Sequence, residues 1–342
     1  MRVLGIETSC DETSAAVLGD EGQVLSNVVL SQDALHAPYG GVVPELASRR
    51  HIETISAVVR EALDLAKTGL DQVDLLAATQ GPGLIGSLLV GLSFAKGLAY
   101  YHKKPLIGVD HVEAHIEGAL VENQDLPFPA MALVVSGGHT SLYFLEKPLS
   151  FELLGRTRDD AAGEALDKIA KFLGLGYPGG PVIERKASGG KAKAFPFSTP
   201  RMSDRSLDFS FSGLKTAALK IIRDNKIAKG SRKLADFLAS FEQAVVSAIL
   251  ENLGRALAER QARSIILCGG VARNKRLRAE FEKLALAEKL AFAVPSPKLC
   301  TDNAAMIASL GLKKFRAFGP NVPAPNLGLN AYPRISAAAT AE

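Results

Sequence analysis

Short apolar runs alternate along the chain with longer segments in which apolar residues recur every three or four positions. Between residues 47 and 66 this spacing is that of an amphipathic helix, and a more uniformly apolar helix is expected from Leu84. The short runs predict strands at 3–7, 14–18, 74–79 and 105–109, with a further pair of strands within 23–30. Strands that alternate with helices indicate an α/β fold.

The pattern begins again near Met131. Strands are predicted at 132–135 and 141–145, joined by the turn SGGHT, and this hairpin parallels the opening LGIETSCDETSAAVL in design. Two such hairpins, each near the start of a domain-sized segment, indicate an internal duplication. A helix at 234–260, a strand at 264–268 and a helix from Asn274 follow.

The length of 342 residues corresponds to about two domains. Residues 122–129 hold two prolines and are a plausible crossing point between them. We therefore expect a first half at 1–128, with 303–342 as a candidate completion of it, and a second half at 129–302.

Composition narrows the class of protein. Hydrophobic residues are 47% and charged residues 22%, which fits a soluble globular chain and excludes disordered and fibrous classes. The longest apolar stretch, 84–101, is interrupted by glycine, serine and lysine, so a buried helix is expected there rather than a membrane span. The N-terminus lacks the pattern of a signal peptide, and three scattered cysteines without CxxC spacing favour a reducing cytoplasm.

The net charge of +4 is unevenly distributed. Residues 185–233 carry 13 Lys and Arg against three acids, a local charge of +10 that leaves −6 for the rest of the chain. This segment interleaves its basic residues with four aromatic rings, which suits backbone neutralisation and base stacking on a nucleic acid. The rings are Phe195, Phe197, Phe209 and Phe211.

His111 and His115 are four residues apart, a spacing that places two imidazoles on one helix face where they can bind one metal ion. The zinc-protease pattern HExxH differs, because Val112 stands where that pattern needs a glutamate beside the metal-bound water. Two solvated histidines are the alternative. Spacing does not identify a third ligand, and Asp302 is one candidate among many carboxylates.

Three glycine-rich or hydroxyl-rich segments are candidate ligand sites. Backbone N–H groups in the turn 136–140 suit phosphate oxygens, whereas the turn 8–14 adds two carboxylates that could hold a metal or accept a proton. A Gly-Gly pair after the strand 264–268 would let a nucleotide approach a helix N-terminus. The loop 174–181 is too rich in glycine and proline to be an element, so it is expected to be a ligand-facing loop or a flexible connection.

These motifs together resemble one family. The segments LGIETSCDETSAAV, GGVVPELASRRH, GPGLIGSLLVG, DHVEAHIEGA, VVSGGHT, DDAAGEALDK, YPGGP, SFSGLK, CGGVARN and TDNAAMIA look like the TsaD family of tRNA threonylcarbamoyladenosine transferases, from residue 1 to about 334. The resemblance implies the fold of the actin, Hsp70 and sugar-kinase (ASKHA) superfamily, with two related α/β subdomains around a nucleotide cleft.

The resemblance also implies a reaction and its residues. A threonylcarbamoyl group would pass from threonylcarbamoyl-AMP to N6 of the adenosine 3′ of the anticodon, in tRNAs that read codons beginning with A, and AMP would leave. Asp11 or Glu12 would take the proton from N6, and the sequence does not distinguish between these two carboxylates. The implied metal ligands are His111, His115 and Asp302, with iron as the expected metal and zinc as the alternative. The implied adenylate contacts are Val134, Val135, Ser136, Gly137, Gly138, Asp167, Gly180, Glu184 and Asn274.

The implied partners are tRNA, a TsaB-like paralogue and a small TsaE-like ATPase. No association with a membrane is expected. An exposed apolar face on the first half would be the structural trace of the paralogue. The alternative functions are a zinc metallopeptidase of the glycoprotease type, an ATPase or kinase of the same fold, and a non-catalytic scaffold. For tRNA, the basic segment predicts that glutamate at Lys215, Lys220 and Arg223 weakens binding in a salt-dependent way.

Overall fold

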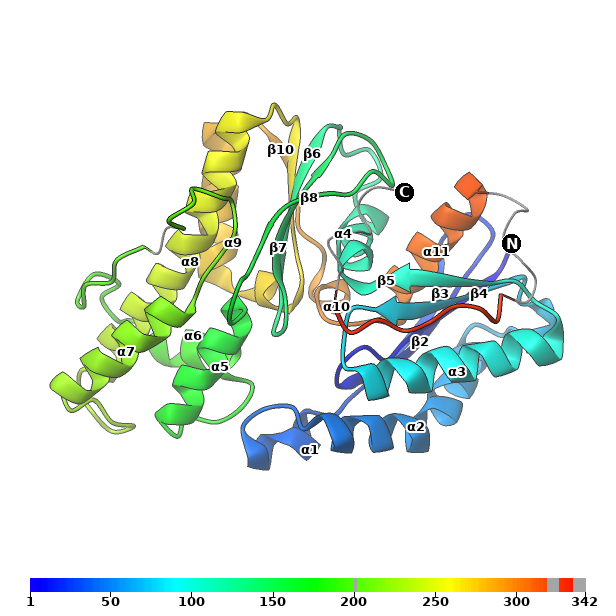
Figure 1. The fold of residues 1–342 in the computed structure, drawn as a ribbon, viewed down its shortest axis with the longest axis horizontal. Helices are drawn as coiled ribbons and strands as arrows, with labels where there is room; N and C mark the ends of the chain where they lie inside the picture. Colours follow the sequence, from blue (N-terminus) through cyan, green and yellow to red (C-terminus); the bar gives the residue numbers. More distant parts are fainter. Residues whose placement is uncertain (200–201, 319–325, 335–342) are drawn as a thin grey trace. The chain divides into compact units, whose positions relative to one another are not determined.

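Two five-stranded sheets organise the chain, and the computed structural model describes residues 1–199, 202–318 and 326–334 (Figure 1). The chain divides into two units. One consists of residues 1–122 together with the segment from 301 onward, and the other of residues 123–300.

The first unit has the strand order β3-β2-β1-β4-β5, in which β1, β2 and β3 are antiparallel and β4 and β5 run parallel to β1. The strands are β1 Val3–Glu7, β2 Glu12–Leu18, β3 Val24–Ser31, β4 Leu75–Gly81 and β5 Leu106–Asp110. The helices are α1 Asp33–His36, α2 Pro44–Leu65, α3 Ile85–His102, α4 His111–Val121 and α11 Ala304–Phe318, with short 3-10 helices at Ala37–Tyr39 and Leu70–Gln72.

Helices cover both faces of this sheet. On one face, Leu4 and Ile6 of β1 pack with apolar residues of α2 and α3, including Ile55, Val58 and Leu92. On the other face lie α4 and α11 (Figure 1). Here Gly5 permits a close approach, because a Cβ at this position would lie 2.4 Å from the carbonyl oxygen of Ala304 in α11.

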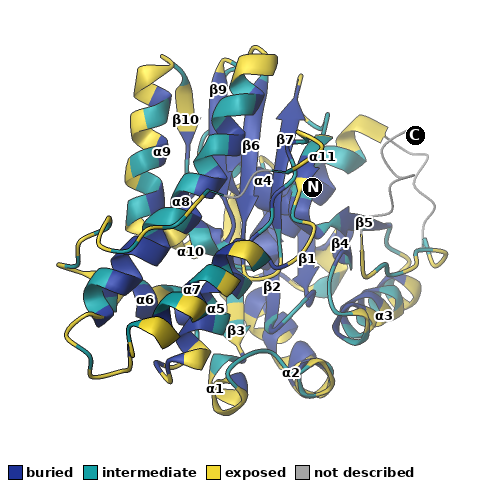
Figure 2. Ribbon diagram, turned by 60° about the vertical axis from the view of Figure 1, so that its left-hand side comes forward, coloured by how far each residue is buried: buried dark blue, intermediate teal, exposed yellow. Residues whose placement is uncertain are grey.

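The second unit has the strand order β10-β9-β6-β7-β8. Its strands are β6 Ala130–Val135, β7 Thr140–Leu145, β8 Glu152–Arg156, β9 Ser264–Cys268 and β10 Ala291–Ala293. Its helices are α5 Ala162–Phe172, α6 Gly179–Ala187, α7 Ser212–Asp224, α8 Leu234–Glu259, α9 Lys275–Ala287 and α10 Pro297–Cys300, with a 3-10 helix at Gly270–Arg273. Apolar side chains of β6 and β7 form the core with α5 to α8, and the central strands are buried in both units (Figure 2).

The two sheets have the same topology. In each, an antiparallel meander of three strands (β1–β2–β3 or β6–β7–β8) is followed by two strands that extend the sheet in parallel beside the first. The predicted duplication is therefore confirmed. The turn between β1 and β2 corresponds to the turn between β6 and β7, so the two polar turns identified in the sequence occupy equivalent positions.

Three sequence expectations are corrected by the structure. Residues 23–30 form one strand rather than a pair, because β3 pairs with β2 along its whole length. The loop 174–181 is partly helical, since α6 begins at Gly179, whose N–H is bonded by the Asp167 carboxylate. Pro181 fits the first turn of α6, where a backbone N–H has no intrahelical partner.

The third correction concerns the aromatic rings of the basic segment. Phe209 and Phe211 are buried in the core, and Phe195 packs against Phe237 with a centroid separation of 5.9 Å. Phe197 likewise packs against Phe241, at 5.8 Å. Phe209 and Phe211 are therefore not placed to stack on nucleic-acid bases, and Phe195 and Phe197 are half-buried against α8.

Candidate metal centre and nucleotide-binding turns

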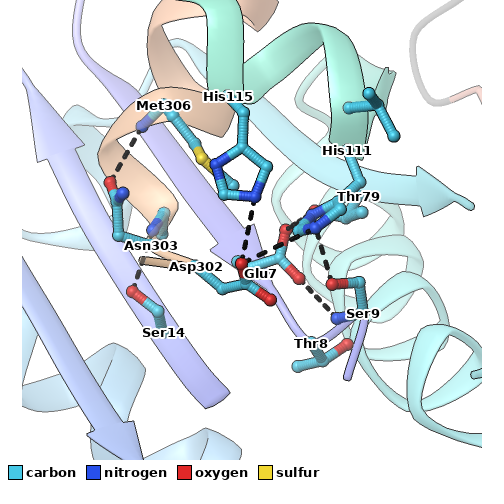
Figure 3. A network of polar contacts seen from close by, with 12 residues as sticks. Glu7, Thr8, Ser9, Ser14, Thr79, His111, His115, Asp302, Asn303 and Met306 are labelled. Atoms are coloured by element: carbon cyan, nitrogen blue, oxygen red, sulfur yellow. Dashed lines mark hydrogen bonds and ion pairs between the residues drawn. The ribbon is translucent and has the colours of Figure 1, made fainter. Parts of the chain in front are cut away.

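The two candidate metal-binding histidines lie on the first turns of α4. Strand β5 ends at Asp110, whose Oδ1 accepts hydrogen bonds from the N–H groups of Val112 at 2.8 Å and Glu113 at 3.0 Å. This N-cap starts the helix at His111 and satisfies two of its free donors. Four residues later, His115 lies one turn along the same face, so both imidazoles point toward the same side (Figure 3).

Asp302 completes a cluster with these histidines. Its Oδ1 lies 3.1 Å from Nε2 of His115 and 3.7 Å from Nε2 of His111, and one ligand atom from each residue lies within 4.8 Å of the others. Asp302 is placed by the start of α11, where the Asn303 side chain accepts a hydrogen bond from Met306 N and Ala304 N donates to Ser14 Oγ (Figure 3). Three ligands from two distant segments thus face one point within the first unit.

The cluster fits a divalent metal ion. His115 is fully buried, yet within the described residues neither of its ring nitrogens makes a hydrogen bond. Burial lowers the pKa of His111, but Asp302 and Glu7 raise it to about 9, so without a metal a proton balances these carboxylates. Two imidazoles and one carboxylate are a donor set that suits iron or zinc and leaves further coordination positions open.

Glu7, which the sequence analysis did not single out, supports this cluster from behind. Its carboxylate is fully buried at the end of β1, with Oε2 3.0 Å from Nδ1 of His111. Burial raises the pKa of Glu7, but the charge and hydrogen bond of His111 outweigh it and hold the pKa below its usual value. The sequence does contain a signal for Glu7: a charged residue ends a strand that is otherwise apolar, and such a residue is rarely buried without a partner.

Asp11 lies in the turn between β1 and β2, and Glu12 begins β2, in the same unit as the metal cluster. Burial raises the pKa of Asp11, and the charge of Asp302 raises it further. The pKa of Glu12 is raised well above its usual value by burial and by the charges of Asp11 and Asp302. The pKa of Glu12 is thus raised more than that of Asp11, so Asp11 is the member of the pair that ionises first.

A second buried network holds this turn in place. Nε2 of His51, on α2, lies 2.9 Å from the carbonyl oxygen of Cys10, and its Nδ1 lies 2.8 Å from Oγ1 of Thr13. Burial lowers the pKa of His51, which favours the neutral ring. A neutral ring can donate to the carbonyl from Nε2 and accept from the threonine hydroxyl at Nδ1, so the turn that carries Asp11 is fixed from both sides.

The equivalent turn of the second unit exposes its backbone. Ser136 N donates to the His139 carbonyl at 2.8 Å, and His139 N donates to Ser136 Oγ at 3.1 Å. At Gly137 and Gly138 an added Cβ would meet nothing within 4 Å, so a ligand can approach this backbone closely. The side chains of Val134 and Val135, by contrast, are fully buried in β6.

The remaining candidate nucleotide contacts gather where α5, α6 and α9 meet. Asp167 Oδ1 accepts from Gly179 N at 2.6 Å, and Glu184 Oε1 accepts from Lys275 N at 3.1 Å, at the starts of α6 and α9. Asn274 caps α9 through Leu277 N and donates to the buried Glu242 at 2.7 Å. These side chains hold the helix starts together. Gly180 leaves space beside them, because a Cβ added at this position would meet only Leu166 Cδ1 within 4 Å, at 3.8 Å.

The basic segment divides into paired and exposed residues. Lys215 Nζ lies 2.5 Å from Asp160, which also pairs with Lys168 at 2.6 Å, so Lys215 joins α7 to α5. Lys220 and Arg223, further along α7, are exposed. Lys215 thus has a structural contact, and a role of these three residues in nucleic-acid binding stays a prediction.

Comparisons with known proteins agree with these features. The model of the family "TsaD: tRNA N6-adenosine threonylcarbamoyltransferase" matches residues 23–309. A protein of that name from Syntrophobacter fumaroxidans is 51% identical over 324 residues, covering 93% of this chain and 96% of its own. The protein of the same name from Geobacter sulfurreducens is also 51% identical, over 311 residues and 91% of each chain.

Solved structures show the fold. Full-length HypF in its phosphate- and nucleotide-bound form matches with a TM-score of 0.61 at 14% identity, over 94% of this chain and 56% of that one. Component A of the (R)-2-hydroxyglutaryl-CoA dehydratase of Acidaminococcus fermentans matches with a TM-score of 0.56 at 16% identity, over 92% of this chain and 98% of that one. At these identities the likeness concerns the fold alone, and it is the expected fold of the actin and sugar-kinase type.

Proposed function

Because the chain belongs to the TsaD family of tRNA N6-adenosine threonylcarbamoyltransferases, and so is a tRNA-modifying transferase of a metal-dependent family, we propose how its residues perform the transfer. The proposed donor is threonylcarbamoyl-AMP, and the proposed acceptor is N6 of the adenosine 3′ of the anticodon in tRNAs that read codons beginning with A. The observation that carries the proposal is the buried cluster of His111, His115 and Asp302 in the unit that also bears the carboxyl pair Asp11 and Glu12.

The proposed metal ligands are His111, His115 and Asp302. The ion is proposed to be Fe²⁺, since two histidines and one carboxylate form the donor set common at non-haem iron, and Zn²⁺ is the alternative. Such an ion polarises a carbonyl and fixes its orientation. The protein's own contribution is a nearly water-free setting, because both histidines are buried.

Asp11 is the proposed general base. Adenine N6 is a poor nucleophile, and it must lose a proton as it attacks the donor carbonyl. Asp11 ionises before Glu12, and its pKa is raised from that of an ordinary aspartate, which brings it closer to the working pH of a base. Glu12 serves by hydrogen bonding to Asp11. The choice that the sequence left open is thereby narrowed to Asp11.

AMP is proposed to bind the second unit. The open backbone of Ser136, Gly137 and Gly138 offers N–H groups to the phosphate, and Gly180 lies where the adenosine would rest near Asp167, Glu184 and Asn274. Because Glu184 and Asn274 already hold the start of α9, they contribute mainly by shaping this surface.

A metallopeptidase is disfavoured by the geometry of α4. Val112 is buried, and Glu113 forms an ion pair with Lys314 of α11 at 2.7 Å. No residue of α4 therefore takes the role of the protease glutamate beside the three ligands. An ATPase or kinase of the same fold would have no use for the histidine pair, and a scaffold would have no use for the ligand set.

The proposed partners are a TsaB-like paralogue and a TsaE-like ATPase, in the cytoplasm. An exposed apolar face on the first unit supports the paralogue: the outer sides of α2 and α3 are exposed (Figure 2). This face carries Ile52, Leu65, Ile85, Leu89, Tyr100 and Tyr101. Free cysteines at Cys10, Cys268 and Cys300 support a reducing compartment. Among the described helices, none combines the length and the apolar character that crossing a bilayer requires.

The decisive experiment is reconstitution. Purified protein, its two partners, threonylcarbamoyl-AMP and an unmodified tRNA should yield threonylcarbamoyladenosine on nucleoside analysis. The His115→Ala variant should yield none while keeping its fold by circular dichroism. Absence of product with the wild-type protein, with its partner complexes verified, would contradict the proposed function, and full activity of His115→Ala would contradict the metal assignment.

A further inference from the structure

We propose that Glu7 is a positioning residue of the metal centre, which holds His111 in the tautomer and orientation that present Nε2 rather than Nδ1 to the ion. The proposal rests on the proposed metal centre and adds a residue from outside the three ligands. It concerns this chain's own side chains, all of which lie in the first unit.

The Glu7 carboxylate is itself rigidly held. Its Oε1 accepts the backbone N–H of Ser9, and its Oε2 accepts the hydroxyl of Thr79, from β4, at 2.6 Å (Figure 3). Both oxygens of a fully buried side chain are thus fixed by the main chain of the β1–β2 turn and by a neighbouring strand. A carboxylate held in this way cannot turn to follow the histidine, so the histidine takes its orientation from the carboxylate.

The same Oε2 lies 3.0 Å from Nδ1 of His111. An ionised carboxylate only accepts hydrogen bonds, so the ring must carry its hydrogen on Nδ1 to make this contact. The other ring nitrogen, Nε2, faces Asp302 at 3.7 Å, on the side of the remaining two ligands. The rotation of the ring is therefore set by Glu7, which directs Nε2 toward the other two ligands.

The two histidines differ in this respect. His115 makes no ring hydrogen bond within the described chain, whereas His111 is held by Glu7 and lies 3.2 Å from Ser9 Oγ. One ligand is thus oriented by a carboxylate outside the ligand set, whereas the other has its fellow ligand Asp302 as its polar neighbour, at 3.1 Å. A carboxylate behind a ligating imidazole increases its basicity, and loss of such a partner typically lowers metal affinity by about 10- to 100-fold.

The test compares Zn²⁺ affinity of purified apoprotein, measured by competition with a chromophoric chelator, for the wild type and three variants. Glu7→Gln cannot accept at both oxygens, so its affinity should fall by about 10- to 100-fold. Thr79→Val, which removes one of the contacts on Glu7, should give a smaller loss. Glu113→Gln is the matched control, because Glu113 lies on α4 but pairs with Lys314, and it should bind zinc as the wild type does.

A second measurement uses only the wild-type protein, so it does not depend on whether a variant folds. In zinc-loaded wild-type protein with ¹⁵N-labelled histidine, NMR should show His111 protonated at Nδ1 and bound to zinc through Nε2. Zinc on Nδ1, or wild-type affinity in a folded Glu7→Gln protein, would overturn the proposal. Failure of the metal centre itself looks different: His115→Ala would then bind zinc with the wild-type affinity.

Discussion

Oδ1 of Asp302 lies 3.1 Å from Nε2 of His115, although the whole second unit separates the two residues in the sequence. The helix α11 that follows Asp302 packs on β1, β2 and β4, and Gly5 permits its close approach. The third proposed ligand of the metal site is therefore placed by the return of the chain to the first sheet.

Asp302→Asn should remove metal binding and turnover without unfolding the protein. The amide is isosteric but neutral, and two buried imidazoles without a carboxylate bind a divalent ion weakly. Since loss of a supporting carboxylate costs about 10- to 100-fold, loss of a direct ligand should exceed that range. Metal content after dialysis and nucleoside analysis of the tRNA measure the effect. Wild-type metal content in the variant would exclude Asp302 as a ligand.

Asp11→Asn should lower kcat by about 10²- to 10⁴-fold with little change in KM for tRNA, as expected for loss of a general base. Glu12→Gln should cost less, because a glutamine amide can donate a hydrogen bond to Asp11 and so keeps a contact with the base. Steady-state kinetics of both variants, over a range of pH, distinguish the two residues. A larger loss in Glu12→Gln than in Asp11→Asn would reverse the assignment.

His51 should make the fold sensitive to mild acid. Burial depresses the pKa of His51 in the folded state below the ordinary value of 6.5. Below pH 6.5 this residue is therefore protonated more readily in the unfolded chain than in the folded one. The free energy of unfolding should therefore fall as pH drops below 6.5, by at most about 1.4 kcal/mol per pH unit, and level off below the folded-state pKa.

Urea unfolding of the wild type and of His51→Gln at several pH values isolates this effect. The variant loses the hydrogen bonds to Cys10 and Thr13, so it should be less stable at pH 8, but its stability should fall less steeply between pH 6.5 and 5. Parallel curves for the two proteins would show that His51 does not carry the dependence.

Lys220→Glu with Arg223→Glu should weaken tRNA binding and reduce its salt dependence, because both side chains are exposed on α7. Each lost phosphate contact should lower the slope of log affinity against log salt by about 0.7 to 0.9. Lys147→Glu, at an exposed residue outside the basic segment, is the control for the effect of a charge reversal as such. An unchanged slope in the double variant would place the tRNA elsewhere.

Lys215→Glu is expected to behave differently from those two. It would set a second carboxylate beside Asp160 and break the contact that joins α7 to α5, so the protein should unfold at a lower temperature. A thermal melt separates this structural effect from a loss of tRNA affinity. An unchanged melting temperature would show that the ion pair contributes nothing measurable.

Local patterns predicted much of the fold. The strands expected at 3–7 and 264–268 agree with β1 and β9 at both ends, because each is an apolar run bounded by polar residues or glycine. The start of α6 was missed because proline and glycine suggest a loop, and the side chain that stabilises this helix start, Asp167, lies outside the local sequence.

Fewer features of the candidate metal site could be predicted from the sequence. Spacing identified His111 and His115, and resemblance added Asp302. The charge at the end of an apolar strand marked Glu7, but its contact with His111 could not be predicted, because only the strand order β1-β4-β5 brings the two residues together. The phenylalanines of the basic segment were misjudged for a similar reason: their burial depends on α8, whose packing on them no local pattern reveals.

The insertion of the second unit between His115 and Asp302 has a consequence during biosynthesis. A ribosome that adds about 5–20 residues per second needs roughly 10–40 s to pass from one ligand to the other. Throughout that interval the nascent chain offers the histidine pair without its carboxylate. Capture of the ion by all three ligands therefore waits until the second unit has been made, so a chain truncated by premature termination cannot form the complete metal site.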